Sequence, residues 1–518
     1  MNQNEQADRL SEETSSIWFE TVRLPSFKKL NGNLQTEAVI VGGGITGITT
    51  AYLLAKEGVK VVLIEADRLC SGTTGYTTAK ITAQHTLIYD ELIGHFGEEK
   101  AKLYYLANQG ARDWIGQMVR THDIHCDFRE QPAVVYADKE KEVRQIEKEA
   151  EAYRKLGIPG TVTESLDLAL PVKKALIMHH QAQFHPLMYL HFLIAELVKM
   201  DVSIYEETVA VEMTEAPSCV VHTKEGHQIH CSDVLICSHF PFYDKGFYFS
   251  RMYPERSYLM AVETEQPIPD GMYISAGNPK RSVRSLSCNG RAMTLVGGEN
   301  HKTGRGENTA NHFQKLAVFA DTLGAKEIIC HWSAQDYTTL DKIPYIGKLS
   351  SRHSHMYVAA GFKKWGMTSG TLAARLLADQ LLERDNPYSE VFSPQRFTAD
   401  PVIKRFMIDN GSIAGHLIKG KLEKGKESIK HLKNDQGAVV SLNGKRAGAY
   451  KNKEGRLTIV DTTCTHMGCE VNWNQGERTW DCPCHGSRYE ATGEVIDGPA
   501  KKPLRQLYRE HHTQDGEK

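Results

Sequence analysis

Two short segments near the C-terminus combine cysteine and histidine at close spacing. They are Cys464–Cys469 (Cys-Thr-His-Met-Gly-Cys) and Cys482–Ser487 (Cys-Pro-Cys-His-Gly-Ser). In each segment a histidine follows the first cysteine by two or three positions, so two neighbouring loop tips would each give one sulfur and one nitrogen ligand. A [2Fe–2S] cluster with two cysteines on one iron and two histidines on the other suits this arrangement. Tetrahedral Zn²⁺ is the alternative occupant of such a set.

The two segments resemble the cluster-binding boxes of the Rieske family, C-x-H-x-G-C and C-P-C-H-G-S. The four ligands that this resemblance implies are Cys464 and Cys482 on the inner iron, and His466 and His485 on the outer iron. The resemblance also implies a disulfide between Cys469 and Cys484, which would join the two loops. A zinc site would leave these last two cysteines and the following Gly-Ser-x-Tyr unexplained.

Two hydroxyl side chains indicate which branch of the Rieske family the domain resembles. Ser487 and Tyr489 occupy the positions where the high-potential branch has hydroxyls that hydrogen-bond cluster sulfurs. Such bonds stabilise the reduced cluster and raise its potential, within a Rieske range of about −150 to +300 mV. The domain is therefore similar to the cytochrome bc type of electron carrier, and residues 498–500 (Gly-Pro-Ala) resemble its cluster-covering loop.

A glycine-rich motif near the N-terminus is flanked by the elements of a βαβ unit. The apolar run Thr36–Val41 predicts a strand, and Ile48–Leu54 has a helical apolar pattern after the motif Gly42–Gly47. Val61–Ile64 predicts a second strand that ends at Glu65. The G-x-G-x-x-G pattern lets the backbone approach a pyrophosphate at the helix N-terminus, and the acid can bind ribose hydroxyls. The predicted dinucleotide contacts are Gly42, Gly44, Gly47 and Glu65.

A second loop of small residues favours FAD over NAD as the dinucleotide. The stretch 68–80 resembles the loop beside the flavin in the superfamily of D-amino-acid oxidase, sarcosine oxidase and glycine oxidase, which implies contacts from Ser71 and Thr78. The sequence shows no second glycine-rich fingerprint for NAD(P). Where some family members attach flavin through a cysteine, this chain has Gln335 or Asp336. The resemblance therefore implies FAD held without a covalent link.

The same resemblance extends over about residues 35–400 and implies further flavin contacts. Val202–Val211 predicts a strand, in which the backbone of Val209 would meet the adenine. The stretch 361–370 opens a long helix whose free N–H groups would face the flavin N1–C2=O edge and stabilise the anionic reduced flavin. The contacts implied in this stretch are Gly361, Gly366, Met367 and Thr368.

Candidate residues for substrate contact are fewer. In this superfamily the flavin accepts a hydride from a C–H bond beside an amine, and the protein orients the substrate, often through an arginine and a tyrosine on a carboxylate. The candidate catalytic residues in suitable segments are Arg256, Tyr258, Arg284 and Lys364. A solvated surface position is the alternative for each of them.

Length and composition limit the remaining possibilities. A chain of 518 residues implies two or three domains, and its net charge of −2 gives no case for nucleic acid. We find no run of about 18 apolar residues and no signal-peptide pattern. Of the 11 cysteines, four lie in the two boxes and the others are scattered. This usage is typical of a reduced, cytoplasmic protein.

The expected fold is an α/β FAD-binding Rossmann-like domain with an α+β antiparallel-sheet substrate domain, followed by a small all-β Rieske domain. The expected boundaries are 1–35 for an N-terminal extension, 36–400 for the flavoprotein, 401–434 for a basic linker and 435–515 for the Rieske domain. The linker holds six lysines between positions 419 and 433. It is either a solvated segment or a peripheral contact with an anionic membrane beside a quinone pool.

Together the two expected cofactors predict a route for electrons. An amine or amino acid would reduce FAD by hydride transfer, and electrons would then pass singly through the cluster to an external acceptor, with His466 and His485 as the exit. Two alternatives stay open. One is an O₂-using oxidase in which the Rieske domain is a docking or redox-sensing module. The other is reverse flow from a ferredoxin-like donor to FAD.

Overall fold

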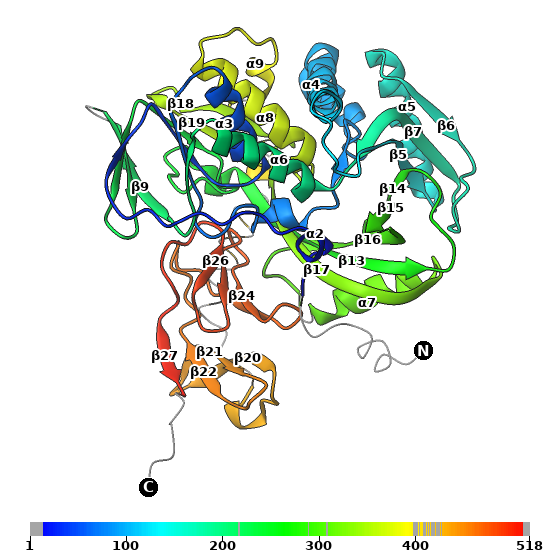
Figure 1. Cartoon of the computed structure of the whole chain (residues 1–518). Coiled ribbons are helices and arrows are strands. Elements are labelled where there is room, and N and C mark those ends of the chain that lie inside the picture. The colour runs from blue at the N-terminus through cyan, green and yellow to red at the C-terminus, as the bar shows by residue number, and fades with distance from the viewer. Residues whose placement is uncertain are drawn as a thin grey trace. The chain divides into compact units, whose positions relative to one another are not determined.

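The chain forms two compact units, which are described separately (Figure 1). The computed structural model describes residues 14–215, 218–288, 290–306, 309–396, 402, 405–407, 411, 413, 415, 420, 425 and 427–510. The large unit comprises Met1–Met252, Arg256–Asn300 and Gln314–Ile403, and the small unit comprises Tyr253–Glu255, His301–Phe313 and Lys404–Lys518. Most of the predicted basic linker, including Lys419, Lys421, Lys424 and Lys426, lies outside the described residues.

The large unit contains a six-stranded sheet in the order β18-β19-β12-β2-β3-β8. Its strands are β2 (Ala38–Val41), β3 (Val61–Ile64), β8 (Ser203–Tyr205), β12 (Asp233–Ile236), β18 (Tyr345–Ser350) and β19 (His353–Ala360). β2 and β3 pair in parallel and are buried throughout, which explains their continuous apolar sequence. Helix α3 (Ile45–Lys56) connects them and packs against α8 (Gly366–Leu381). The predicted βαβ unit is confirmed.

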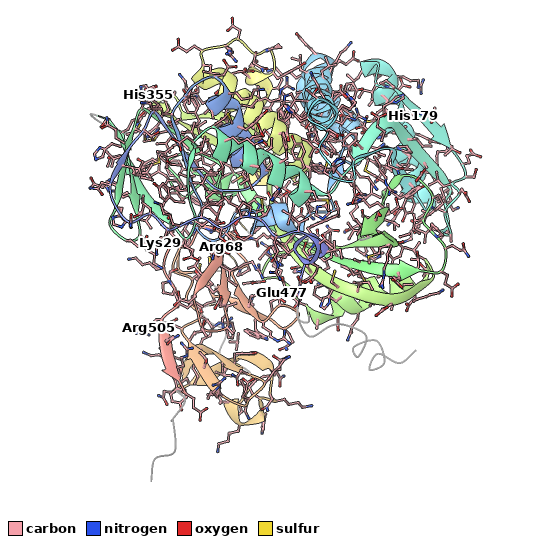
Figure 2. The ribbon with its side chains drawn as sticks, viewed as in Figure 1. Lys29, Arg68, His179, His355, Glu477 and Arg505 are labelled. Carbon is pink, nitrogen blue, oxygen red and sulfur yellow. A yellow bond between two sulfur atoms is a disulfide. The ribbon has the colours of Figure 1, made fainter. Side chains whose placement is uncertain are left out.

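The predicted strand Val202–Val211 is wrong in its middle. β8 ends at Tyr205, and β9 (Ala210–Thr214) belongs to a different sheet. Between them the buried carboxylate of Glu206 accepts the backbone N–H of Leu69 at 2.8 Å and pairs with Arg68 at 2.7 Å (Arg68 is labelled in Figure 2). This carboxylate ties the chain to the loop after β3, so the backbone leaves the sheet there.

A nine-stranded sheet forms the other half of the large unit, in the order β17-β13-β16-β15-β14-β5-β7-β4 with β6 beside β7. Its strands are β4 (Lys80–Ile81), β5 (Arg129–Ala137), β6 (Gly160–Thr163), β7 (Lys174–Gln183), β13 (Met252–Thr264), β14 (Met272–Ser275), β15 (Arg281–Cys288), β16 (Arg291–Lys302) and β17 (Ala325–Thr339). Helix α5 (Glu140–Leu156) packs on β5 and β7. The predicted antiparallel substrate sheet is therefore present, and within it β14 and β5 pair in parallel.

The remaining described elements of these parts cover the two sheets or join them. A small sheet contains β1 (Leu34–Gln35), β11 (Gln228–Cys231), β10 (Cys219–Thr223) and β9. The helices are α2 (Ile17–Thr21), α4 (Tyr89–Thr121), α6 (Pro186–Lys199), α7 (Ala310–Asp321) and α9 (Ser389–Phe392), and η1 (Thr73–Tyr76) is a 3₁₀ turn.

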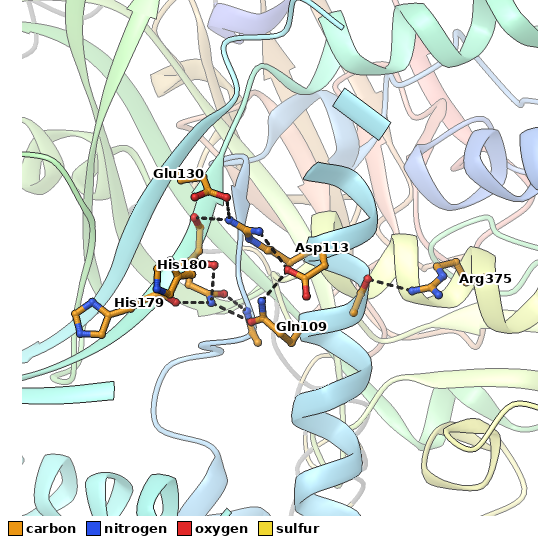
Figure 3. A network of polar contacts seen from close by, with 10 residues as sticks. Gln109, Asp113, Glu130, His179, His180 and Arg375 are labelled. Atoms are coloured by element: carbon orange, nitrogen blue, oxygen red, sulfur yellow. Dashed lines mark hydrogen bonds and ion pairs between the residues drawn. The ribbon is translucent and has the colours of Figure 1, made fainter. Parts of the chain in front are cut away.

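A polar network joins α4 to β5 and β7 (Figure 3). Arg112 donates to the carboxylate of Glu130 at 2.7 Å and to the carbonyl oxygen of Gln181 at 3.2 Å. The side-chain amide of Gln181 donates to the carbonyl of His179 at 2.9 Å, and its oxygen accepts the N–H of Ala83 at 2.8 Å. Because Ala83 follows β4, these bonds hold the end of β7 against the strand that enters the site described below.

Two four-stranded antiparallel sheets form most of the small unit, in the orders β20-β21-β22-β27 and β23-β24-β25-β26. Their strands are β20 (Gln436–Leu442), β21 (Lys445–Lys451), β22 (Leu457–Val460), β23 (Asn472–Asn474), β24 (Thr479–Asp481), β25 (Arg488–Glu490), β26 (Val495–Asp497) and β27 (Gln506–Arg509). Asn443 and Gly444, at φ +51° and +78°, form the tight turn between β20 and β21. Trp480 is fully buried against Gly448, where a Cβ atom would lie 2.6 Å from its ring. The predicted all-β domain is confirmed.

Candidate functional site

The two cysteine–histidine segments lie in neighbouring loops of the small unit. The first connects β22 to β23, and the second connects β24 to β25. The sulfur atoms of Cys469 and Cys484 form a disulfide between them, as the resemblance implied. Since the bridged residues are 15 positions apart, the disulfide also restricts the unfolded chain.

The four predicted cluster ligands lie in like pairs. The thiols of Cys464 and Cys482 are within hydrogen-bonding distance of each other, and the rings of His466 and His485 have centroids 5.0 Å apart. Sulfur beside sulfur and nitrogen beside nitrogen is the donor set of a cluster with two cysteines on one iron and two histidines on the other. Both thiols and His485 are buried, whereas His466 is partly exposed. The residues present therefore fit a [2Fe–2S] cluster.

A set of three sulfur atoms in the same loops is a separate candidate for a zinc site. The Sγ atoms of Cys469, Cys482 and Cys484 lie within 4.8 Å of one another. Two of the three belong to the disulfide, and a metal ligand must be a thiolate. In this set Cys482 alone keeps a thiol for a metal, so a three-sulfur zinc site does not fit.

Two buried hydroxyls reach the thiol of Cys464. The phenolic oxygen of Tyr489 lies 3.2 Å from Cys464 Sγ, and the side chain of Ser487 also hydrogen-bonds this sulfur. The N–H of Ala500 donates to Ser487 Oγ at 3.1 Å. Residues 498–500 therefore contact the second cluster-binding segment, which is the position expected of a covering loop.

The 301–313 segment also packs on the second cluster-binding segment, inside the small unit. Asn472 Nδ2 donates to the carbonyl oxygen of Gly304 at 2.9 Å. Gly304 has φ +69°, and a Cβ atom there would lie 2.5 Å from the nitrogen of Pro483 and 2.7 Å from the carbonyl carbon of Cys482. The backbone of the 301–313 segment thus lies directly on a cluster-binding peptide. Sequence reasoning missed this segment, whose one local signal is Gly-Arg-Gly at 304–306.

The predicted dinucleotide contacts meet at the carboxyl ends of β2 and β3. Glu65 accepts the N–H of Gly43 at 2.6 Å, which brings the acid to the glycine loop, and burial raises the pKa of this carboxyl. Gly42 has φ +115°, and a Cβ atom at Gly47 would lie 1.9 Å from the carbonyl oxygen of Gly42. Gly44 is the N-cap of α3 and provides no side-chain cap. A helix start of this kind binds phosphate through backbone N–H groups, so the loop fits the pyrophosphate of FAD.

The other predicted flavin contacts lie around the start of α8 and the loop before β4. α8 begins at Gly366, and Thr368 Oγ1 accepts the N–H of Thr82 at 2.9 Å. This bond joins the helix start to the strand that follows Thr78. Gly361 has φ +80°. Ser71 and Val209 are half-buried and Met367 is buried; for all of these residues contact with FAD stays a prediction.

The structure buries three of the four candidates for substrate contact. Arg256, Tyr258 and Arg284 are 1%, 0% and 2% exposed on strands of the nine-stranded sheet. The alternative of a solvated surface position is wrong for these three. Lys364 is half-buried, and its backbone N–H donates to the carboxylate of Asp336. The roles of all four stay predictions.

Sequence reasoning did not single out Lys80, a second buried cation near Arg284. Its Nζ donates to the carbonyl oxygen of Tyr273 at 2.9 Å and to Ser282 Oγ at 2.7 Å. Burial, reinforced by the charge of Arg284, lowers the pKa of Lys80 to about 7, and burial lowers the pKa of Arg284 to about 9. Among the described residues neither cation has a carboxylate oxygen within 4.0 Å. The one local feature that could have indicated a buried lysine is the position of Lys80 between the apolar residues Ala79 and Ile81.

Polar atoms without partners lie in the same place. In the described part of the chain, Arg284 Nη2, Gln183 Oε1 and Ser285 Oγ are buried without a hydrogen-bond partner. Gln183 Nε2 and Arg284 Nη1 both donate to the carbonyl oxygen of Ser285, at 2.9 and 3.1 Å, which keeps the three residues together. Lys80 pairs with Gln183 between β4 and β7. Buried polar atoms are usually satisfied, so Lys80, Gln183 and Arg284, called the cationic site below, have the character of a binding site.

Comparison with known proteins places both halves of the chain. Residues 37–380 match the family model for FAD dependent oxidoreductases (DAO), and residues 427–508 match the Rieske [2Fe-2S] domain. YhfW of Bacillus subtilis (strain 168), named as a Rieske 2Fe-2S iron-sulfur protein, is 47% identical over 498 residues, which are 96% of this chain and 98% of that one. Gamma-glutamylputrescine oxidoreductase of Escherichia coli (strain K12) is 24% identical over 394 residues, covering 72% and 90% of the two chains. The crystal structure of glycine oxidase from Geobacillus kaustophilus superimposes with a TM-score of 0.59 at 19% identity, covering 70% of this chain and 100% of that one.

The fold and the two sites define an oxidoreductase that uses a flavin and an iron–sulfur cluster. The chain belongs to the DAO family of FAD-dependent oxidoreductases and carries a C-terminal Rieske domain. Its cofactors are FAD and one [2Fe–2S] cluster. Among the residues that the structure describes, no helix combines the length and apolar character needed to cross a membrane.

Proposed function

We propose that this enzyme oxidises a small amine or amino acid that carries a carboxylate, and that the electrons leave through the Rieske cluster to an external one-electron acceptor. The observation that carries the substrate class is the cationic site. Arg284 and Lys80 are buried and have no ion-pair partner among the described residues. Burying an unpaired charge is unfavourable, so a carboxylate of the substrate is the counter-charge that the site lacks.

Two relatives support the chemical class of the substrate. One is named as an oxidoreductase of gamma-glutamylputrescine, an amine, and the other as an oxidase of glycine, an amino acid. Both substrates carry an amine and a carboxylate in the same molecule. The proposed substrate therefore presents an amine to the flavin and a carboxylate to Arg284.

When bound, FAD supplies a two-electron acceptor and the cluster supplies a one-electron carrier. The side chains of the protein orient the substrate. Arg284 Nη2 binds its carboxylate, and Lys80 adds a second positive charge. Oxidation of the amine removes a hydride from carbon and a proton from nitrogen, and the C–N bond becomes a C=N bond. The N-terminus of α8 would favour negative charge on a flavin that is held there without a covalent link.

The small unit supports an exit for single electrons. Tyr489 and Ser487 bond to the sulfur of Cys464, and such bonds stabilise a reduced cluster. His466 is partly exposed, and the adjacent Met467 is 49% exposed. An exposed apolar side chain beside the outer-iron histidine suits contact with a redox partner.

The test is an anaerobic screen of amines and amino acids with the purified holoprotein. Flavin absorbance and the EPR signal of the reduced cluster are followed together. We expect an amine with a carboxylate to bleach the flavin and then to produce the cluster signal. Arg284→Lys keeps the charge but loses the planar two-nitrogen contact, and should lower the apparent affinity for this substrate about tenfold or more.

Each part of the proposal has its own contrary outcome. A cluster that stays oxidised while the flavin is bleached would contradict the relay and favour an O₂-using oxidase. A cluster potential well below that of the flavin would favour electron flow in the reverse direction. Reduction by amines that lack a carboxylate, with equal affinity, would contradict the role of the cationic site.

A further inference from the structure

The N-terminal clamp, defined here as residues 16–21, precedes the family's dinucleotide fold and packs into the large unit (α2 in Figure 1). Ser16 is the N-cap of α2, and its hydroxyl accepts the N–H of Trp18 at 3.2 Å while donating to the carbonyl oxygen of Gly75 at 2.6 Å. Trp18 is fully buried. A short helix held by a buried indole is therefore part of the folded unit, although the sequence suggested only an extension.

The clamp and Trp332 together fix the loop before β4 through three consecutive carbonyl groups. The carbonyl oxygen of Gly75 accepts Ser16 Oγ, that of Tyr76 accepts Trp332 Nε1 at 3.0 Å, and that of Thr77 accepts Trp18 Nε1 at 2.8 Å. Three side-chain bonds in succession set the orientation of these peptide planes. The next residue is Thr78, a predicted flavin contact.

The indole of Trp18 also contacts the cationic site. The guanidinium carbon of Arg284 lies 5.4 Å from the centre of the Trp18 ring, and the His185 ring packs edge-on against this indole at 4.9 Å. Thr21 Oγ1 lies 2.8 Å from His185 Nε2. Arg284 Nε donates to the carbonyl oxygen of Thr78 at 2.6 Å. Aromatic stacking and two carbonyl bonds thus hold the guanidinium, and Nη2 is the nitrogen left for a ligand.

We propose that the N-terminal clamp is a positioning element of the substrate site, and that Trp18 holds Arg284 in the orientation that binds the substrate's carboxylate. This inference rests on the proposed function, because it assigns an anionic ligand to the cationic site. The indole contributes a cation–π contact to the guanidinium and fixes the loop that accepts Arg284 Nε. The clamp lies outside the region matched by the family model, residues 37–380.

The experiment measures binding of benzoate to the oxidised holoprotein by isothermal titration calorimetry, with neutral benzamide as the matched ligand. Trp18→Leu should lower the affinity for benzoate at least about fivefold. It should leave the EPR spectrum of the reduced cluster unchanged. Trp18→Phe keeps an aromatic ring over Arg284, so its affinity for benzoate should fall less than that of Trp18→Leu. Trp332→Phe removes the neighbouring bond to Tyr76 but keeps the indole of Trp18 over Arg284, so it should weaken benzoate binding less than Trp18→Leu does.

The outcomes separate this inference from the proposed function. Equal benzoate affinity in the wild type and Trp18→Leu would overturn the clamp and leave the carboxylate site intact. A wild type that does not prefer benzoate over benzamide would overturn the proposed substrate class itself. If Trp18→Leu does not fold, amide hydrogen exchange of the wild type decides. Benzoate should slow exchange in residues 16–21, and unchanged exchange there would contradict the clamp.

Discussion

The hydroxyl of Tyr489 lies 3.2 Å from the sulfur of Cys464, so a phenol that is fully buried in the small unit bonds directly to a predicted inner-iron ligand. The bond stabilises the negative charge that a reduced cluster places on its sulfur ligands. We expect Tyr489→Phe to lower the midpoint potential of the cluster by about 60 mV, the equivalent of about 1.4 kcal/mol for one electron. Redox titration followed by EPR measures this shift.

Two neighbouring positions provide comparisons for the Tyr489 prediction, one without and one with an expected effect on the potential. Trp480→Phe changes a buried aromatic side chain of the same core and should alter stability with little effect on the potential. Ser487→Ala removes the other hydroxyl at Cys464 and should lower the potential as well. Equal potentials in the wild type and Tyr489→Phe would show that the phenol only fills space.

Loss of one disulfide cysteine should be worse than loss of both. In Cys469→Ser the freed Cys484 thiol lies within 4.8 Å of the sulfur of Cys482, a predicted iron ligand, and the two can form a new disulfide under oxidising conditions. The double variant Cys469→Ser/Cys484→Ser cannot do so. Iron and sulfide content per chain should therefore fall furthest in the single variant.

Stability of the small unit gives a second readout of the disulfide. Both variants should lose up to about 3 kcal/mol of unfolding free energy, because a loop of this length is no longer closed in the unfolded chain. Iron retention that is higher in the single variant than in the double variant would contradict the mispairing argument. Thermal unfolding followed by circular dichroism measures the loss of stability.

Gly304 should be sensitive to a single methyl group, and Gly306 should tolerate one better. A Cβ atom at Gly304 would lie 2.5 Å from the nitrogen of Pro483, whereas at Gly306 nothing lies within 4 Å. Both glycines have positive φ, +69° and +109°, so backbone strain of about 1 kcal/mol is common to both substitutions. Gly304→Ala should therefore shift the EPR spectrum of the reduced cluster, and Gly306→Ala should not. Identical spectra in both variants would mean that the 301–313 segment does not act on the cluster-binding peptide.

Carboxylate binding should weaken as pH rises through about 7, where Lys80 loses its proton. The direction of this pH dependence follows from linkage. A bound anion favours the protonated form of Lys80, so the affinity for the anion falls as Lys80 loses its proton. Burial lowers the pKa of His185 to about 4 and that of Arg284 to about 9. Between about pH 6 and 8 the pH dependence therefore reports Lys80. Benzoate affinity measured by calorimetry should drop by up to about tenfold per pH unit above the pKa.

Lys80→Met is the matched variant for this pH dependence. It should bind benzoate more weakly at pH 6 and show a nearly flat profile. It should also be more stable than the wild type at pH 6 and below, because the folded pKa of about 7 lies below the ordinary value of 10.5 and the buried charge opposes folding there. A wild-type profile that stays flat from about pH 6 to 8 would contradict the assignment.

The parts that the sequence predicted well share one property, which is that their residues are neighbours in the chain. The cysteine–histidine boxes and the glycine motif each bring several functional groups within a few positions, so spacing alone indicates the chemistry. Glu65 was predictable for the same reason, because it ends the strand that follows the motif. The small all-β domain followed from short strands and turn residues such as Asn443-Gly444.

The cationic site could not be predicted in this way. Lys80 bonds to residues 193 and 202 positions away, and Arg284 bonds to a carbonyl 206 positions away. Only the folded sheet brings them together, and nothing in the local pattern separates a buried arginine from a surface one. Trp18 was missed because its binding surface is 59 positions further along the chain. The cytoplasmic location and the membrane contact of the basic linker stay predictions.

The path of the chain through the small unit has a consequence for how such fusions can be engineered. Tyr253–Glu255 and His301–Phe313 belong to that unit together with the C-terminal part. A gene fragment that starts at residue 404 would omit the peptide that rests on Pro483 and should give a less stable iron–sulfur protein than the whole chain. Transplanting this domain onto another flavoenzyme would require moving the internal peptide as well.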